Sequence, residues 1–502
     1  MSPSFASVAQ RPWIVLAALF PLVATAATPS FTLTEIPLPA PAQPGQSALT
    51  PTAINSSGQV TGTFYTPTGE HAFLYSGETL DDLGTLAATG NGNVPGAATG
   101  FALNSSGTVV GQIVDPNTLQ FSQGFIYANG VMSALTNPAN SGTLCWATGI
   151  NDDGLIVGSC NSLPAYAVIY NNGAGKQIGP GGFLAVNNYG QIAGFKDIDA
   201  ALYQNGTWTA LPNPAGQQVT FSVATSINNA GEIVGFSNTG NGSALIWSYA
   251  NGATQALPAM PGSCNTTQCG GTPTLQINNM GQMVGTNITF PLPTNQAAYS
   301  PFWLESGTAT DLNSLIDPND PNAPFVTLLV ANGINDDGWI VATGIDSRTQ
   351  VTGGYILKPT TPFGAAVQVQ APADGTAGTA FIVMWTNQSV TSCTASGGTS
   401  GDGWTGSMSV HGGQQQVTES MAGSYTYTLT CDSASAPVTA SAKVMVAGTS
   451  SGGGSSDPPE SSSGGGGAVG WLTLGGLFLM ACRIVQRRLV TPLRWVKARK
   501  NS

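Results

Sequence analysis

Short apolar runs separated by glycine, asparagine and proline dominate the first 360 residues of this chain. Typical runs are Ala72-Phe73-Leu74-Tyr75, Ala167-Val168-Ile169-Tyr170 and Ala244-Leu245-Ile246-Trp247. Each is only a few residues long and is bounded by turn-forming residues, which is typical of β-strands and too short for helices. The pattern therefore predicts an all-β fold built from many short strands.

One motif recurs seven times among these strands, with the pattern apolar-Asn-x-x-Gly-x-apolar, most often followed by x-Gly. Successive copies are 36 to 57 residues apart, and such a period indicates a repeat architecture. Asparagine at the start of a tight turn accepts backbone hydrogen bonds, and glycine three residues later adopts a left-handed conformation at little cost. The predicted structural turn residues are Asn55 and Gly58, Asn104 and Gly107, Asn151 and Gly154, Asn187 and Gly190, Asn228 and Gly231, Asn278 and Gly281, and Asn335 and Gly338.

Each copy supplies four strands, two around the turn, a third ten to fifteen residues later and a short fourth such as Leu80–Leu83 or Trp208–Leu211. Four strands per repeat is the size of one propeller blade. The seventh copy stops after its third strand, at Lys358-Pro359, while the chain begins with an unpartnered strand at Phe31–Leu38. We therefore expect a seven-bladed β-propeller over residues 28–362, closed by the N-terminal strand. An open β-solenoid is the alternative.

The repeat resembles the HAF-type extracellular repeat family over roughly residues 31–360. The resemblance rests on the Ile-Asn-x-x-Gly-x-Val-x-Gly core and on His71-Ala72-Phe73-Leu74-Tyr75 followed by Leu80–Leu86. Only the first copy keeps the histidine. The family implies an exported repeat domain and no established reaction.

Residues 363–447 leave the repeat and alternate apolar and polar positions in several runs, which predicts a small β-sandwich. Trp385, Cys393, Tyr425, Tyr427 and Cys431 resemble a bacterial immunoglobulin-like domain. In that family the segment around Cys393 pairs with the one that ends at Cys431, which implies a disulfide between them.

Both ends of the chain carry targeting patterns. Residues 1–27 combine Arg11, the apolar stretch Trp13–Val23 and the small residues Ala24-Thr25-Ala26, and so predict a secretory signal peptide, with an uncleaved anchor as the alternative. Residues 448–467 form a Ser/Gly-rich linker. Residues 468–502 contain the uncharged run Ala468–Cys482 and then a basic segment, which predicts a transmembrane helix with a cytoplasmic tail.

Gly464–Gly467, the short apolar run and the basic end resemble the GlyGly-type C-terminal sorting signal of Gram-negative bacteria. That resemblance implies a sorting protease that cleaves near the glycines and a protein displayed at the cell surface or released. A permanent single-pass anchor is the alternative. Under either reading the body of the protein is exported.

Charge and cysteine content narrow the function. Seven of the 13 Lys and Arg residues lie in the last twenty positions, so the body is strongly acidic and is predicted not to bind nucleic acid. Export permits disulfides. Six of the seven cysteines form close pairs in sequence, although six cysteines allow fifteen connectivities. The nearest-neighbour pairs are Cys145/Cys160, Cys264/Cys269 and Cys393/Cys431.

Candidate chemistry is sparse, and we predict no catalytic, cofactor or metal residues. The chain has two histidines, His71 and His411, and both fit turn or strand-start positions. The Asp152-Asp153-Gly154 and Asp336-Asp337-Gly338 turns raise the possibility of calcium, but other copies form the same turn without carboxylates. The cysteines lack the spacing of a zinc site. The remaining carboxylate pairs, Asp197/Asp199 and Asp317/Asp320, fall in expected loops.

These features favour a non-catalytic surface protein that presents its propeller to an extracellular protein or glycan. The alternative is an exported propeller glycoside hydrolase or lyase that acts on polysaccharide, and a third is an envelope-assembly component. A carboxylate cluster in the central channel would favour the enzyme, whereas an apolar or Ser/Thr/Asn-lined channel would favour the binder.

Overall fold

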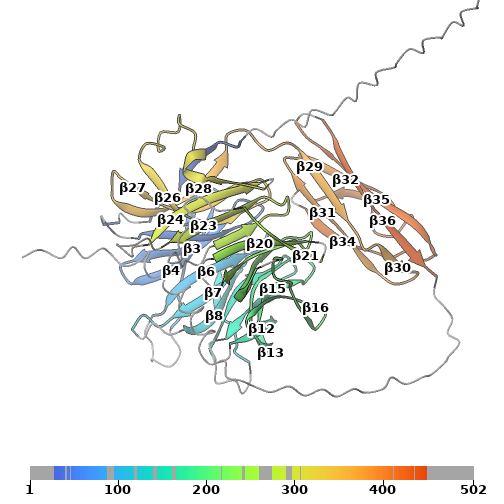
Figure 1. The fold of residues 1–502 in the computed structure, drawn as a ribbon, viewed down its shortest axis with the longest axis horizontal. Helices are drawn as coiled ribbons and strands as arrows, with labels where there is room; N and C mark the ends of the chain where they lie inside the picture. The colour runs from blue at the N-terminus through green and yellow to red at the C-terminus, as the bar shows by residue number, and fades with distance from the viewer. Residues whose placement is uncertain are drawn as a thin grey trace, which may run out of the picture.

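The structure, a computed structural model, describes residues 28–448 except for several short stretches. The stretches left out are 40–41, 44, 46, 88–94, 118–120, 139–143, 161–164, 216, 240–243, 251, 259–273, 290–296, 306, 411 and 435. The described residues form strands and one short 3-10 helix, η1 (Leu312–Leu315), so the fold is all-β as predicted. Seven four-stranded sheets form a β-propeller-like ring, and two further sheets form a second domain beside it (Figure 1).

The seven sheets of the ring follow the repeat, and in each the strands pair in antiparallel order. Their strands are β2(Leu49–Ile54), β3(Val60–Thr66), β4(Gly69–Ser76) and β5(Thr79–Gly84) in sheet 1; β6(Ala97–Leu103), β7(Val109–Val114), β8(Phe121–Ala128) and β9(Val131–Ala134) in sheet 2; β10(Cys145–Ile150), β11(Ile156–Cys160), β12(Tyr166–Asn171) and β13(Ala174–Pro180) in sheet 3; β14(Gly182–Val186), β15(Ile192–Lys196), β16(Asp199–Gln204) and β17(Thr207–Ala210) in sheet 4; β18(Val219–Ile227), β19(Ile233–Thr239), β20(Ala244–Ala250) and β21(Ala253–Ala256) in sheet 5; β22(Thr274–Ile277), β23(Met283–Thr289), β24(Ala298–Glu305) and β25(Thr308–Asp311) in sheet 6; and β26(Val326–Ile334), β27(Ile340–Asp346), β28(Val351–Pro359) and β1(Phe31–Glu35) in sheet 7.

Sheet 7 is assembled from both ends of the repeat region. β1 pairs antiparallel with β28, from Phe31 opposite Pro359 to Glu35 opposite Tyr355. The expected N-terminal strand is therefore present at the outer edge of the seventh sheet. Its Phe31 is fully buried, and its ring lies 5.6 Å from that of Trp303 in sheet 6.

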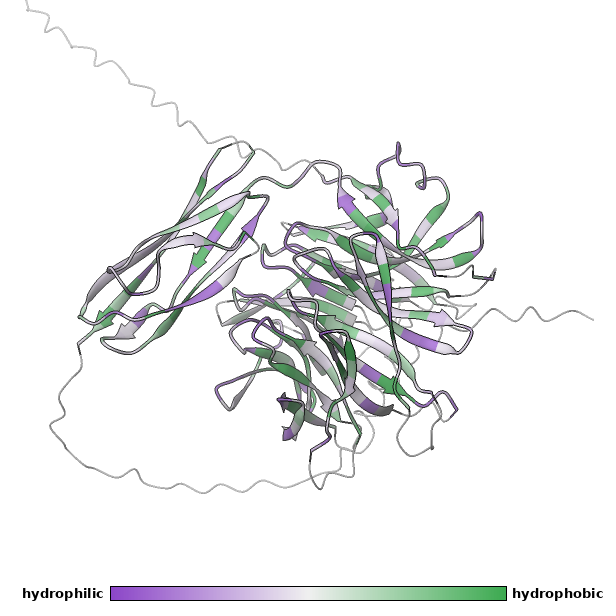
Figure 2. Ribbon diagram, turned by 180° about the vertical axis from the view of Figure 1, so that it is seen from behind, coloured by the Kyte–Doolittle hydropathy of each residue, from purple (hydrophilic) through white to green (hydrophobic). Residues whose placement is uncertain are grey.

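The apolar core lies between neighbouring sheets. One cluster, for example, joins Ala72 and Leu83 of sheet 1 to Ala98, Val109 and Phe125 of sheet 2. In Figure 2 hydrophobic stretches run along the strands of the ring, and hydrophilic ones occur at many of its loops. Each sheet is apolar on both faces, so it needs a neighbouring sheet on each side to bury them.

The motif forms the same turn in all seven sheets. The amide N–H of each turn glycine donates to the carbonyl of the asparagine three residues earlier, at 3.0 to 3.1 Å. These glycines have φ between 69° and 81°, a left-handed conformation that strongly favours glycine. They are Gly58, Gly107, Gly154, Gly190, Gly231, Gly281 and Gly338. The Asn Oδ1 atom accepts from the N–H four residues later, at 2.9 Å in sheet 1.

The same seven asparagines also link the sheets to one another. Each donates from its side-chain Nδ2 to the backbone carbonyl of the asparagine in the next sheet, at 2.9 to 3.3 Å. The chain of bonds runs Asn55, Asn104, Asn151, Asn187, Asn228, Asn278, Asn335 and returns to Asn55. We call this set the asparagine ring. An open solenoid cannot form its last bond, from Asn335 to Asn55.

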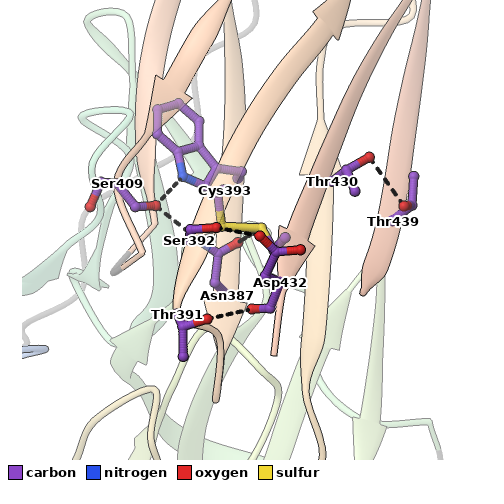
Figure 3. The surroundings of a disulfide bond; sticks show 10 residues. Asn387, Thr391, Ser392, Cys393, Ser409, Thr430, Asp432 and Thr439 are labelled. Carbon is purple, nitrogen blue, oxygen red and sulfur yellow. Dashed lines mark hydrogen bonds between the residues drawn. A yellow bond between two sulfur atoms is a disulfide. The ribbon is translucent and has the colours of Figure 1, made fainter. Parts of the chain in front are cut away.

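The second domain, residues 366–447, is a sandwich of a three-stranded and a five-stranded sheet. Its strands are β29(Ala366–Gln370), β31(Phe381–Gln388) and β34(Gly413–Val417) in the first, and β30(Asp374–Thr376), β36(Val438–Ala447), β35(Gly423–Asp432), β32(Ser392–Gly397) and β33(Gly406–Met408) in the second. The predicted Cys393–Cys431 disulfide joins β32 to β35 and is buried (Figure 3). Asn387 donates to the carbonyl of Ser409 beside it, as does the indole N–H of Trp385.

The Cys145–Cys160 disulfide is also present and joins β10 to β11. Cys264 and Cys269 lie outside the described residues, as do residues 1–27, all of the predicted linker 448–467 except Gly448, and the tail 468–502. Among the residues that the structure does describe, no helix is long and apolar enough to cross a membrane.

We predict that Phe31→Ala strongly destabilises the ring, because it leaves a cavity between sheets 6 and 7 and weakens the β1–β28 pairing. The expected loss is about 3–5 kcal/mol in urea unfolding, the usual cost of removing a buried Phe side chain. Thr34→Ala, at an exposed position of the same strand, is the control. Equal midpoints for the two variants would contradict the closing role of β1.

Asn278→Asp tests the asparagine ring. Aspartate keeps the acceptor for the N–H groups of Met280 and Gln282 but loses both donors, to Gln282 Oε1 and to the carbonyl of Asn335. We expect a loss of at least about 2 kcal/mol in urea unfolding, since buried acceptors are left unpaired.

Asn229→Asp is the matched control, because Asn229 directly follows Asn228, the ring asparagine of the neighbouring sheet 5. Asn229 offers Oδ1 to the N–H of Asn188, a task that aspartate performs in sheets 3 and 7. We expect a clearly smaller loss than for Asn278→Asp, because the acceptor for the N–H of Asn188 is kept. A similar loss in both variants would argue against a specific requirement for the Asn278 amide.

Candidate functional site

A second ring of hydrogen bonds lies next to the asparagine ring, built from the residue that follows each asparagine. In five of the seven junctions the backbone N–H of this residue donates to the side chain of its counterpart in the next sheet, at 2.7 to 3.1 Å. The accepting side chains are Asp152, Asn188, Asn229, Asn279 and Asp336. The other two positions hold Ser56 and Ser105.

This second ring explains the two Asp-Asp-Gly turns. Asp336 accepts from both the backbone N–H and the side-chain Nδ2 of Asn279, each at 2.9 Å. Asp152 accepts from the N–H of Ser105 at 2.8 Å and from Nδ2 of Asn188 at 2.8 Å. Both carboxylates therefore act as hydrogen-bond acceptors between sheets. Across the described part of the chain, no group of three or more His, Cys, Asp or Glu side chains is placed to hold a metal ion.

A cavity of about 200 Å³ lies at this mouth of the central channel. Its lining has three layers. The deepest is apolar, the next is the asparagine ring and the outermost is the second ring, with Gly413 of the second domain also in contact. The apolar layer consists of Ile54, Leu103, Ile150, Val186, Ile227, Ile277 and Ile334.

The turn glycines stand apart from this cavity, although the sequence groups them with the asparagines that line it. Five of them, Gly58, Gly107, Gly190, Gly231 and Gly281, lie beside a side chain of the preceding sheet. A methyl group added at Gly107 would come within 3.0 Å of Gln59, one at Gly231 within 3.4 Å of Gln191, and one at Gly190 within 3.6 Å of Leu155. The glycines therefore shape the turns and the contacts between sheets, while the asparagines face the channel mouth.

The polar groups of the asparagine ring form hydrogen bonds with one another and with residues of the same turns. In sheet 1, Asn55 Oδ1 accepts from Ser57 and Gln59, while Nδ2 donates to Gln59 Oε1 and to the carbonyl of Asn104. The carbonyl of Asn55 accepts from Gly58 and from Asn335. The amide and carbonyl groups of Asn55 are thus engaged in hydrogen bonds within the protein, as are the carboxylates of Asp152 and Asp336.

His71 has neighbours that the sequence did not reveal. Its Nδ1 lies 2.9 Å from Asp82 Oδ1, and its Nε2 lies 3.4 Å from Thr68 Oγ1. The order of groups matches that of a hydroxyl–imidazole–carboxylate triad. However, 3.4 Å is long for a bond to a hydroxyl, the threonine is exposed in the tight turn between β3 and β4, and Asp82 also accepts from the N–H of Gly84. We interpret the contact between His71 and Asp82 as a structural link between β4 and β5. His411 lies outside the described residues.

The remaining acidic pairs have different roles. Asp197 lies in the tight turn between β15 and β16, whereas Asp199, expected in a loop, is the first residue of β16 and pairs with Lys196. Asp320 was expected in a solvated loop but is buried, and its Oδ2 accepts from the N–H of Leu33 at 2.8 Å. Asp317 donates its N–H to the carbonyl of Phe31. These two residues therefore hold β1 in place, which a loop sequence alone gave no means of predicting.

Asp336 stands out electrostatically. Burial raises the pKa of its carboxyl above the ordinary 3.8, the hydrogen bonds from Asn279 lower it, and the nearby charges of Asp337 and Asp152 raise it again. The net shift is upward because no positive charge compensates for the lost solvation. Ionisation of Asp336 therefore lowers the stability of the folded protein.

No family model and no curated protein matches this chain. Among solved structures, a mutant of the Aleuria aurantia lectin in complex with alpha-methyl-L-fucoside matches with 12% identity and a TM-score of 0.29, over 64% of this chain and 99% of that one. A mutant of AofleA from Arthrobotrys oligospora matches with 10% identity and a TM-score of 0.22, over 84% of this chain and 94% of that one. At these TM-scores the likenesses carry no argument about function.

We predict that Asp336→Asn stabilises the protein in a pH-dependent way. Because the pKa is raised in the folded state, the wild-type protein loses stability as the pH rises above the ordinary aspartate value. The gain of the variant should be near zero at pH 3 and should grow to a plateau towards neutral pH, as followed by melting temperature. The exposed Asp81→Asn variant should show no such trend, and a pH-independent gain at position 336 would contradict the assignment.

Proposed function

We propose that this protein is an exported binding scaffold that presents its ring to an extracellular protein or glycan. The observation that carries the proposal is the lining of the channel mouth. It is made of Ile, Leu, Val, Asn and Ser residues, and its two carboxylates, Asp152 and Asp336, are engaged between sheets. A glycoside hydrolase or lyase would need free carboxyl groups here, whereas a binding scaffold needs only rigidity.

The two edges of the ring differ in a way that supports this function. On one edge, which we call the turn face, all seven turns have the same length and the same internal bonds. On the opposite edge the described connections between sheets vary, from Gly181 alone between β13 and β14 to residues 312–325 between β25 and β26. Variable loops on a rigid scaffold are the usual location of binding residues. We therefore place the ligand-binding surface on the variable edge.

Two buried disulfides indicate an oxidising environment outside the cytoplasm. We further propose that residues 1–27 direct export and that residues 468–502 tether the protein to a Gram-negative membrane until a sorting protease removes them. The HAF-type and immunoglobulin-like resemblances are part of the same proposal. The second domain then acts as a spacer between the ring and the linker.

The test is binding of the purified full chain to a glycan array and to extracellular protein extracts, with Asn278→Asp as a control whose ring is weakened. We expect saturable binding to a defined set of glycans or to one protein, reduced in the control. Turnover of a polysaccharide without retained binding would contradict the proposal and favour an enzyme.

A further inference from the structure

The second domain lies against the turn face of the ring, on the side of its three-stranded sheet (Figure 1). Gln388, at the end of β31, donates from Nε2 to the carbonyl of Asp336 at 2.8 Å and to Gln282 Oε1 at 3.3 Å. Gln414, in β34, donates from Nε2 to Asp153 Oδ2 at 2.6 Å. Gln388 is itself almost fully buried. The second domain is therefore joined to the ring by hydrogen bonds from the side chains of Gln388 and Gln414.

These contacts lie on opposite sides of the channel. Gln388 binds sheets 6 and 7, while Gln414 binds sheet 3, which faces them across a ring of seven. Gly413, next to Gln414, lines the cavity between the two anchor points. The edge of the three-stranded sheet therefore bridges the mouth instead of resting on one side of it.

A second cavity, of about 300 Å³, continues the same contact over sheets 5 and 6. Its walls combine Glu232 and Asn279 of the ring with Gln368 and Gln370 of β29. Val367 and Val369, the alternate residues of that strand, pack against the core of the second domain. The side that faces the ring is thus rich in neutral amides, which can bind a polar surface without forming a salt-sensitive ion pair.

The chain that enters the second domain is also fixed to the ring. The ring of Phe363 stacks on that of Trp303, with centroids 5.6 Å apart and planes 5° from parallel. Phe363 also lies against the turn glycine Gly338, where any side chain would collide with it. With the entry point and two glutamines held, the second domain has a defined position over the mouth.

We propose that the second domain is a lid on the turn-face mouth of the channel. Ligand is then excluded from this mouth and reaches the ring from the variable edge or the rim. The lid follows from the contacts alone, whereas the route of the ligand rests on the proposed binding function.

The lid is tested by a cysteine pair in the full chain, Asp153→Cys with Gln414→Cys. A short thiol crosslinker that attaches to each cysteine through a reducible disulfide should join the pair, as identified by peptide mapping, because the hydrogen bond between Gln414 and Asp153 holds the two positions within its reach. Adding Gln388→Ala, which removes two hydrogen bonds, should slow the reaction about tenfold. Asp153→Cys with Thr430→Cys, an exposed residue of the five-stranded sheet, is the control pair, and the crosslinker should not join it. Equal crosslinking of both pairs, or of neither, would overturn the lid.

The route of the ligand is tested with the same crosslinked protein on a panel of neutral oligosaccharides. Binding should be the same, within about twofold, before and after the crosslink is reduced, since the mouth is closed in both states. Loss of binding on crosslinking would show that ligand enters through the turn face and would overturn this part of the proposal. An absence of any glycan or protein binding would count against the proposed function, while the crosslinking result would still decide the lid.

Discussion

The fold depends on one repeated interaction, the hydrogen bond from each turn asparagine to the carbonyl of the next. Oδ1 of that asparagine shapes its own turn, and Nδ2 binds the neighbouring sheet. One asparagine side chain therefore stabilises both its own turn and the contact between two sheets. Since the seventh bond returns to Asn55, every sheet has a neighbour on both sides. A propeller lacks strand pairing between blades, so such bonds supplement apolar packing in setting how the blades are placed.

The asparagine ring also governs the chemistry of the channel mouth. Amides that hold sheets together are not free to bind substrate, and the two carboxylates beside them serve the same purpose. Burial without a counter-charge raises the pKa of Asp336, so an ionised carboxylate at that position costs stability. Asparagine at this position, as in sheets 4, 5 and 6, avoids that cost. The turn face is accordingly built for stability, and the second domain covers part of it.

Much of this architecture could be predicted from the sequence, because the repeat encodes local turns and short strands directly. The seven turns and a closing N-terminal strand follow from the repeat, although the strand predicted over Phe31–Leu38 ends at Glu35. The Cys145–Cys160 disulfide agrees with nearest-neighbour pairing, and the immunoglobulin-like resemblance implied Cys393–Cys431. The long-range partners could not be predicted. Asp320 resembles any loop aspartate until it is seen to bind Leu33, and Gln388 and Gln414 resemble any exposed glutamines until the second domain is placed. The residue after each turn asparagine is always Ser, Asn or Asp, and this restriction was a signal for the second ring. In five of the seven copies its side chain accepts a hydrogen bond from the neighbouring sheet.

Native-state hydrogen exchange across the seven turn peptides tests the closed asparagine ring most directly. If each turn is held by its neighbours on both sides, opening any one requires the ring to open. The amides of all seven turns should then exchange slowly and at a common free energy of opening. Rapid exchange confined to the turns at Asn335 and Asn55, with the other five protected, would show that the ring is open between sheets 7 and 1 and would contradict this account.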